Sequence, residues 1–269
     1  IRDRRNEEVI QHIFSAIKGW VDEFDIDGLR LDVAYCLDHD FVRRLRSFCN
    51  ELKPDFFLVG ETLHGDYNQL MNDEMLHSVT NYECYKGLYS SFNCMNMFEI
   101  NHSLLRQFGP ENWTLYKGKH LLSFVDNHDV TRVASILTNK NHLPLIYALA
   151  FGMPGIPCVY YGSEWGAEGR KEDGDPALRP SFEKPEWNDL TEWISKLAEA
   201  KKQSKALQYG NFMSKVLTNG QCVFEREWEG ERVYVAINAA DSPFYAGFDA
   251  GAAEATDLIT GEKIALNGG

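Results

Sequence analysis

The chain has 269 residues, 44% of them hydrophobic and 25% charged, which fits one large globular domain, alone or with a small appendage, and excludes disorder. With 27 Lys and Arg against 40 Asp and Glu, the formal net charge is −13 and no basic patch is visible, so we expect no nucleic-acid partner. The one long uncharged run, residues 143–161, is interrupted by prolines and glycines and predicts a buried helix, a turn and a buried strand instead of a membrane span.

Apolar residues in the first two thirds of the chain alternate between helical and strand-like spacing. Residues 7–24 have the spacing of an amphipathic helix, for which Asn6 is a suitable N-cap. Further helices are predicted at residues 37–52, 99–108, 145–151 and 187–204, and strands at residues 27–33, 56–61, 78–82, 121–125 and 155–162. Strands that alternate with helices predict βαβ units and a parallel sheet, so the fold class is α/β.

The last part of the chain has a β texture. Strand-like runs at residues 212–217, 222–228 and 232–238, with a turn at Glu229-Gly230, predict a small antiparallel β-sandwich without an obvious closing strand. We therefore predict two domains, residues 1–207 and residues 208–269, the second of them incomplete. Only five strand–helix steps precede the sandwich, where a whole barrel needs eight, so the pattern indicates part of a barrel.

The cysteines and the N-terminus bear on the compartment. The six cysteines show no C-x-x-C pair and no metal-ligand spacing, which predicts reduced, buried thiols. No N-terminal targeting segment is visible, but this absence carries little weight because the barrel pattern lacks its first strands. The reduced thiols are the reason to expect a cytoplasmic protein.

Three of the predicted strands end in acids: Asp32, Glu61 and Asp129. Reacting groups of barrel enzymes come from the carboxyl ends of different strands, so these acids are candidates for one pocket. Each acid alone would serve equally well as a helix N-cap. Arg30 adds weight to the first reading because it lies on the same strand face as Asp32, where it can pair with that carboxylate.

Three acids around one pocket indicate glycoside chemistry. Such chemistry needs one carboxylate as nucleophile and one carboxylic acid that protonates the leaving oxygen, and a third acid can stabilise the charge on the sugar ring. Metal-assisted hydrolysis is the competing use of such a cluster, with His39, His64 and His128 as further ligands.

The segments that carry these acids resemble a known family. Residues 27–32 (DGLRLD), 59–61 (VGE) and 124–129 (FVDNHD) are similar to three of the four signature segments of the α-amylase family, whose fold is a (β/α)8 TIM barrel. Residues 155–164 look like the eighth strand and its loop, and residues 208–269 match the C-terminal sandwich of the family in position. The resemblance implies that the chain carries strands 4 to 8 of the barrel, and it is closest to neopullulanase and maltogenic amylase-like members.

The resemblance also implies roles. Asp32 would be the nucleophile, Glu61 the general acid/base and Asp129 the stabiliser of the transition state. Arg30 would contact the nucleophile, and His128 and His64 would bind the sugar. The implied activity is that of a retaining α-glucan hydrolase or transglycosylase that cleaves α-1,4 bonds, with α-1,6 bonds as a second linkage, in maltodextrin-like substrates.

Two departures from the family pattern bear on cofactors and specificity. The first signature segment is absent; it normally supplies part of a calcium site, so no metal or cofactor is predicted from this chain. Tyr35-Cys36 occupy positions where α-amylases have Lys-His and neopullulanase-like enzymes have Asn-Glu, which leaves the substrate open. The implied partners are an α-glucan oligosaccharide and the N-terminal half of the barrel, without a membrane.

Two alternatives to an active α-glucan hydrolase or transglycosylase remain. A non-catalytic relative could use the barrel as a binding or scaffold domain, although it would not need three acids at strand ends. The polypeptide could also be half of a split or cropped enzyme that is inactive until strands 1 to 3 join it.

Overall fold

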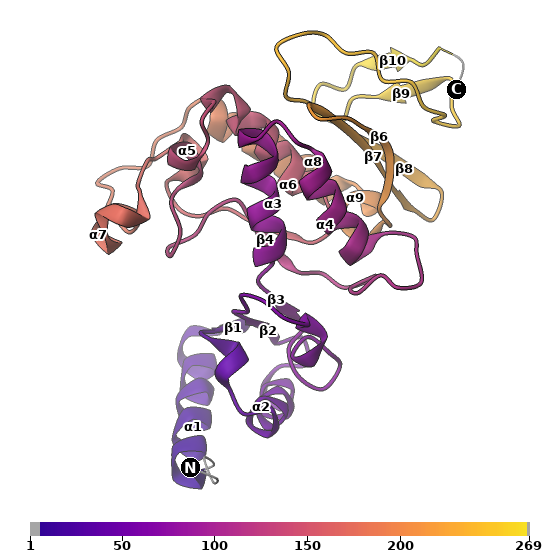
Figure 1. Ribbon diagram of the computed structural model, residues 1–269. Coiled ribbons are helices and arrows are strands. Elements are labelled where there is room, and N and C mark those ends of the chain that lie inside the picture. Colours follow the sequence, from indigo (N-terminus) through magenta and orange to yellow (C-terminus); the bar gives the residue numbers. More distant parts are fainter. Residues whose placement is uncertain (1–5, 268–269) are drawn as a thin grey trace. The chain divides into compact units, whose positions relative to one another are not determined.

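A computed structural model describes residues 6–267 of the chain (Figure 1), so residues 1–5 of the predicted first domain and 268–269 of the second lie outside the described residues. The chain forms two compact units whose relative positions are not determined. The first comprises Ile1–Tyr82 and His120–Leu122, and the second Glu83–Lys119 and Ser123–Gly269. The predicted boundary between residues 207 and 208 falls within the second unit, inside a helix, and stays a prediction.

A parallel sheet forms the centre of the first unit. Its strands are β1 (Gly28–Leu31), β2 (Phe57–Gly60) and β3 (Ser78–Val79), in that order. All the pairings are parallel, and a parallel bridge joins Thr80 to Leu122, the first residue of the next strand. The prediction of parallel βα units is confirmed for this part of the chain. Parallel strands bring their carboxyl ends to one edge of the sheet, which is where the candidate acids follow.

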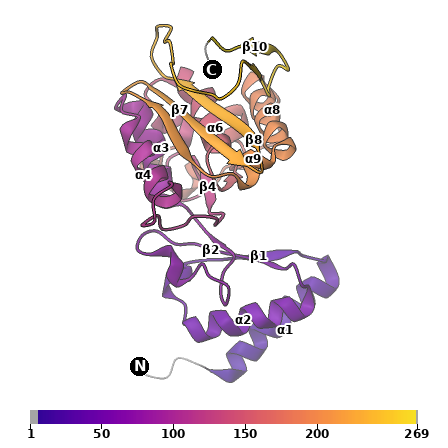
Figure 2. The same ribbon diagram turned by 90° about the vertical axis from the view of Figure 1, so that its right-hand side faces the viewer.

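Two amphipathic helices cover one face of this sheet, α1 (Glu7–Phe24) and α2 (His39–Leu52), as Figures 1 and 2 show. The predicted cap of α1 is confirmed, because the Asn6 side chain accepts hydrogen bonds from two backbone N–H groups of the first turn. The helices pack through aromatic side chains, with the ring of Phe14 stacked 4.5 Å from that of Phe48. This packing fixes α1 and α2 beneath the strands.

The second unit contains a larger set of helices and one more pair of strands. Its elements are α3 (Tyr82–Asn93), α4 (Phe98–Phe108), β4 (Leu122–Phe124), α5 (Val133–Ile136), α6 (Leu143–Gly152), β5 (Ile156–Cys158), α7 (Asp175–Leu178), α8 (Asp189–Gln203) and α9 (Lys205–Tyr209). Strand β4 pairs with β5. Short 3-10 helices complete the description of both units: η1 (Ala34–Cys36), η2 (Tyr67–Gln69), η3 (Lys140–His142), η4 (Ser163–Trp165) and η5 (Lys171–Asp173).

Helix α3 was not predicted from the sequence, because glycine and serines lower its intrinsic helix propensity. The small residues instead serve packing. A Cβ added at Gly87 would lie 3.3 Å from the backbone of Ile100 on α4, so the absence of a side chain lets the two helices approach closely. Tertiary contact overrides local propensity in this helix.

The uncharged run at residues 143–161 forms α6, a turn at Gly155 and β5, as predicted. Among the described residues, no helix combines the length and the apolar character needed to cross a membrane. One part of the prediction is wrong: β5 is only partly buried and Cys158 is exposed, whereas a buried strand was expected. All six cysteines are free, but Cys36 and Cys94 are exposed as well, so only half of the predicted buried thiols are buried.

The C-terminal part of the second unit is an antiparallel sheet of β6 (Met213–Leu217), β7 (Gln221–Trp228) and β8 (Glu231–Asn238). The predicted hairpin is confirmed, since Glu229 and Gly230 both have positive φ, as a two-residue turn requires. A second antiparallel pair, β9 (Glu254–Thr256) with β10 (Lys263–Ala265), was not predicted. Figure 2 shows the three-stranded sheet lying across helices α6 and α9.

Candidate active site

The first unit brings together three of the residues predicted from the sequence. Arg30 lies on β1, Asp32 follows that strand, and Glu61 follows the neighbouring strand β2. One guanidinium contacts both acids: Arg30 Nη1 donates to Asp32 Oδ1 at 2.5 Å, and Nη2 lies 3.2 Å from Glu61 Oε1. The parallel register creates this arrangement, because Arg30 is paired with Val59 and the Glu61 N–H donates to the carbonyl of Leu31 at 2.9 Å.

The two carboxylates differ sharply in environment. The Glu61 side chain is 8% exposed and that of Asp32 is 71% exposed. Glu61 Oε2 accepts a hydrogen bond of 3.0 Å from the backbone N–H of Val33. This leaves one oxygen of Glu61 on the backbone and the other on Arg30, a geometry that fixes the carboxyl group.

The turn after β1 is strained in a way that serves this contact. Val33 has a φ of 47°, a left-handed conformation that costs a β-branched residue about 1–2 kcal/mol. A strained backbone conformation persists only where neighbouring residues stabilise it. Here the left-handed conformation directs the Val33 N–H toward the Glu61 carboxylate. Gly60 is required next to it, since a Cβ there would lie 2.7 Å from that of Ala34.

His64 lies on the exposed loop after Glu61, with its ring 6.3 Å from the ring of Tyr35. Both side chains are exposed, and Tyr35 is one of the two residues that depart from the family pattern. His39 begins α2 and is also exposed. Among residues 6–267, no group of three His, Cys, Asp or Glu side chains is arranged to hold a metal ion.

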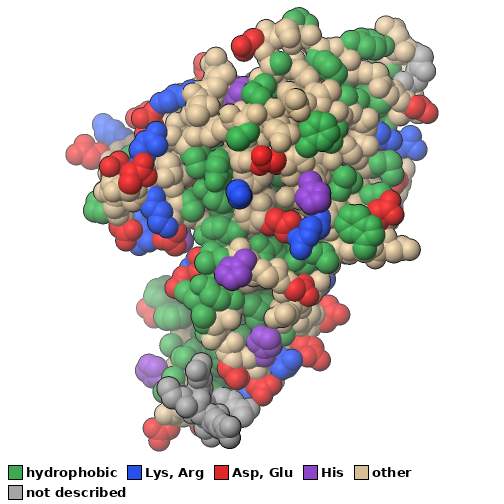
Figure 3. All heavy atoms as spheres, viewed as in Figure 1, with side chains coloured by type: hydrophobic (Ala, Val, Ile, Leu, Met, Phe, Trp, Pro, Cys, Tyr) green, Lys and Arg blue, Asp and Glu red, His purple; other side chains and the backbone are tan. Residues whose placement is uncertain are grey.

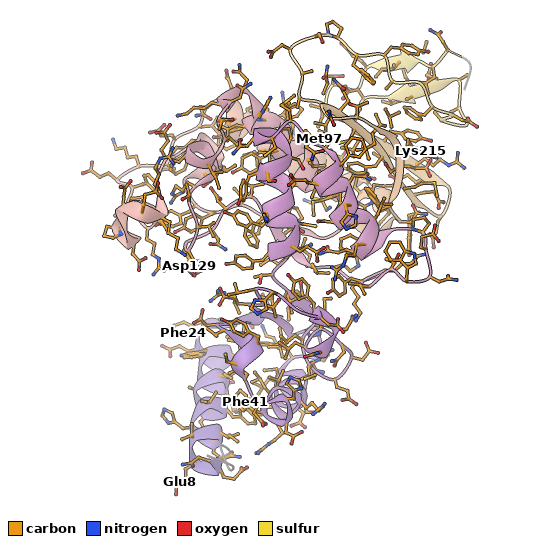
Figure 4. All side chains as sticks on the ribbon, in the orientation of Figure 1. Glu8, Phe24, Phe41, Met97, Asp129 and Lys215 are labelled. Atoms are coloured by element: carbon orange, nitrogen blue, oxygen red, sulfur yellow. The ribbon has the colours of Figure 1, made fainter. Side chains whose placement is uncertain are left out.

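The second unit holds the other predicted residues. Asp129 lies on the segment after β4 (Figure 4), and its Oδ2 is 3.0 Å from Nε2 of His128. Its Oδ1 accepts a hydrogen bond of 2.7 Å from Arg179, whose Nε also donates to the His128 carbonyl at 3.2 Å. Arg179 was not predicted from the sequence, because it lies in a long loop far along the chain from the acid it contacts.

Asp126 is a second residue for which the sequence predicted no role. It is 1% exposed, and its Oδ2 accepts hydrogen bonds from the Val133 N–H and the Ser163 hydroxyl, both at 2.7 Å. Burial raises the pKa of this carboxyl to about 6, and the charge of Glu164 adds to the rise. The sequence feature that could have indicated this role is the position of Asp126 just after the apolar residues that end with Val125. A carboxylate buried there needs hydrogen-bond partners from elsewhere in the fold.

The two groups of residues lie in different units. The expectation that Asp32, Glu61 and Asp129 line one cleft therefore stays a prediction. What the structure establishes is the local order of each group: an arginine holds the first two acids together, and another arginine and a histidine hold the third.

Acids that follow parallel strands in a βα architecture are typical of the active sites of barrel-type enzymes. The model of the family described as "Alpha amylase, catalytic domain" matches residues 3–211, and the chain belongs to this family. Its catalytic domain is a TIM-barrel glycoside hydrolase fold, which a C-terminal sheet domain follows.

Curated relatives carry names from within the same family. A cyclomaltodextrinase of Thermoanaerobacter pseudethanolicus is 28% identical over 87% of this chain and 41% of its own length. An intracellular maltogenic amylase of Bacillus subtilis is 29% identical over 75% of this chain and 34% of its own length. The chain thus spans less than half the length of these relatives.

Solved structures agree on the fold. An α-amylase of Anoxybacillus superposes with a TM-score of 0.80 at 24% identity, covering 99% of this chain and 60% of that protein. A cyclomaltodextrin glucanotransferase superposes with a TM-score of 0.77 at 27% identity, over 88% of this chain and 49% of its own.

Proposed function

We propose that the chain is part of a retaining α-glucan hydrolase or transglycosylase that acts on α-1,4 bonds, and secondarily α-1,6 bonds, of maltodextrin-like substrates. The observation that carries the proposal is the single guanidinium of Arg30 that contacts both Asp32 and Glu61. Retaining glycosidases need a nucleophilic carboxylate and an acid/base carboxyl on either side of the glycosidic bond that is cleaved. An arginine that contacts both acids keeps the two carboxyl groups near each other.

In the proposed reaction, Glu61 protonates the glycosidic oxygen while Asp32 attacks the anomeric carbon. The bond to the leaving sugar breaks as the ester bond to Asp32 forms. Glu61, now deprotonated, then takes a proton from water or from a sugar hydroxyl, whose oxygen displaces Asp32. Exposed Asp32 is accessible to a sugar, and buried Glu61 is shielded, which agrees with these roles.

Asp129 is proposed to stabilise the positive charge that develops on the sugar ring. His128 would donate a hydrogen bond to the same sugar, and its contact with Asp129 orients both side chains. His64, exposed after Glu61, is proposed to contact the substrate on the leaving-group side. No cofactor is proposed.

The names of the relatives support the substrate class: cyclomaltodextrinase and cyclomaltodextrin glucanotransferase refer to cyclic maltodextrins, and maltogenic amylase refers to maltose. We propose that the N-terminal half of the barrel, with strands 1 to 3, completes the enzyme around residues 1–207, and that residues 208–269 form a separate β-domain. We infer a cytoplasmic location, because one relative is named intracellular and all six cysteines are free.

The test uses the complete protein with maltoheptaose as substrate, followed by NMR of the first anomer released. The proposal predicts reducing-sugar release with the α-anomer formed first. Glu61→Gln should lower kcat by about 100-fold or more, since it removes general acid–base catalysis. Glu74→Gln, an exposed carboxylate of the same unit that pairs with Arg43, should leave kcat unchanged. A β-anomer formed first, or full activity of Glu61→Gln, would contradict the proposal.

A further inference from the structure

Arg132 is a fully buried cation near the candidate site. It is 0% exposed and precedes α5, three residues after Asp129. Its guanidinium donates hydrogen bonds of 2.8 Å to the Tyr161 carbonyl, 3.0 Å to the Ser163 hydroxyl and 3.0 Å to the Leu178 carbonyl. Every one of these acceptors belongs to the segment 160–182, so a single side chain holds two distant points of one long loop.

Aromatic rings complete the surroundings of this cation. The guanidinium carbon lies 4.5 Å from the ring centre of Tyr160, 5.3 Å from Tyr161 and 5.9 Å from Phe182. A buried cation is costly unless it is paired, and ring faces with carbonyl oxygens offset that cost. The buried carboxylate of Asp126, which accepts from the same Ser163 hydroxyl, adds an opposite charge nearby.

The packing around the guanidinium is tight. Gly162 has a φ of +87°, and a Cβ there would lie 2.6 Å from the Phe182 ring and 3.2 Å from Arg132 Nη1. At the other contact, the backbone N–H of Arg132 donates to the Gly169 carbonyl at 2.9 Å. Arg132 therefore binds residues 161, 163, 169 and 178 and packs against Gly162.

One of these contacts leads directly to Asp129. Arg132 holds the carbonyl of Leu178, and the next residue, Arg179, donates to Asp129 Oδ1 at 2.7 Å and to the His128 carbonyl at 3.2 Å. The path starts and ends on the segment 128–132 and passes through the loop. These contacts together fix the position of the loop relative to Asp129.

We propose that Arg132 is a positioning residue that acts through Arg179 to hold the carboxylate of Asp129. That Arg132 holds Asp129 in place follows from these contacts alone. That it thereby affects catalysis rests on the function proposed above. An apolar side chain of similar length would fill the space but would leave the Tyr161 carbonyl without its donor, and the Leu178 carbonyl with the Tyr160 hydroxyl alone. Lysine would keep the charge, but one ammonium cannot reproduce the planar fork that reaches three acceptors.

The structural part is tested by hydrogen exchange on the complete protein. Three amides report on the loop and the acid: Ala167 donates to the Gly162 carbonyl, Arg179 to the Asp175 carbonyl and Asp129 to the Asn127 side chain. Arg132→Met and Arg132→Lys should each raise the exchange rates of these three amides by about tenfold or more. Arg179→Met should raise only the rate at Asp129. Slow exchange of the amides of α8 shows that a variant is folded. If these amides exchange fast in Arg132→Met, that variant is unfolded and Arg132→Lys is used to test the proposal instead. An Asp129 amide that exchanges at the wild-type rate in the folded Arg132 variant would overturn the proposal.

The kinetic part is tested with a double-mutant cycle on maltoheptaose. Arg132→Lys should lower kcat by about 100-fold, as expected for a misplaced reacting group, with a much smaller change in KM. The double variant with Arg179→Met should be no slower than Arg179→Met alone. Arg170→Met, an exposed arginine of the same loop, should leave kcat unchanged and combine additively.

Additive effects of Arg132→Lys and Arg179→Met would show that Arg132 does not act through Arg179 and would overturn the proposal. A wild-type protein without glucan turnover would instead refute the proposed function. In that case the exchange experiment still decides whether Arg132 positions Asp129.

Discussion

The guanidinium of Arg30 lies 3.2 Å from Glu61 Oε1, and the two residues come from neighbouring parallel strands. The Glu61 side chain is only 8% exposed, so water solvates its carboxylate poorly. The positive charge of Arg30 compensates for this loss of hydration. The same guanidinium contacts Asp32, so one side chain pairs with both proposed catalytic acids.

Replacing Arg30 should therefore affect stability as well as turnover. Arg30→Met leaves the buried Glu61 without its cation, and we expect the free energy of unfolding to fall by about 1–3 kcal/mol at neutral pH. Arg43→Met removes an arginine from exposed ion pairs of the same unit and should cost about 0–1 kcal/mol. Urea denaturation measures both, and equal losses would contradict the role given to Arg30.

Asp126 should make stability fall as pH rises through the acid range. The pKa of this carboxyl is raised by burial from 3.8 to about 6, so the folded state binds more protons than the unfolded state between these values. Its contribution is full below pH 3.8 and is lost as pH rises through about 6, with a slope of up to about 1.4 kcal/mol per pH unit.

Asp126→Asn should remove this dependence. Relative to wild type, the variant should gain stability as pH rises from 4 to 6, a window that follows from the pKa of Asp126. Denaturation curves at several pH values measure the difference. An exposed acid, Asp173→Asn, serves as the control, and a difference that stays constant with pH would contradict the burial of a titrating Asp126.

Lys201 should act in the opposite sense. Its ammonium donates to the carbonyls of Phe151 and Met153 at the end of α6, and burial lowers its pKa to about 7, with the charge of Arg226 adding to the effect. The folded state thus binds fewer protons than the unfolded state between pH 7 and 10.5, and stability rises with pH over this range.

Lys201→Met removes that slope. The stability of the variant relative to wild type should be most favourable at pH 7 and below, and should decline toward pH 10 as the wild-type cost of a buried ammonium disappears. Lys202→Met, the neighbouring exposed lysine, should show no such trend. A difference between Lys201→Met and wild type that does not change with pH would contradict this account.

The sequence pattern predicted the parallel strands and the amphipathic helices well, because their periodicity is local. Helix α1 and its Asn6 cap are the clearest case. It failed for α3, where Gly87 is there for close packing, and for the exposure of Cys158, which depends on what lies over β5. Such features depend on neighbours that the local pattern does not contain.

The candidate acids could be found because each follows an apolar strand. Arg179 could not be found in this way, since it pairs with Asp129 from fifty positions along the chain. Nor could Arg132, whose acceptors are loop carbonyls that no sequence pattern marks. The space-filling view shows basic and acidic side chains interspersed over the visible face (Figure 3).

The most direct measurement is to trap the proposed glycosyl-enzyme. The complete protein would be incubated with a fluorinated maltosyl fluoride, which forms the covalent ester and slows its hydrolysis, and then digested for peptide mass spectrometry. The account predicts one added maltosyl group, attached to the peptide that contains Asp32 and absent from Asp32→Asn. A label on Glu61 or Asp129, or none on a protein that turns over maltoheptaose, would contradict it.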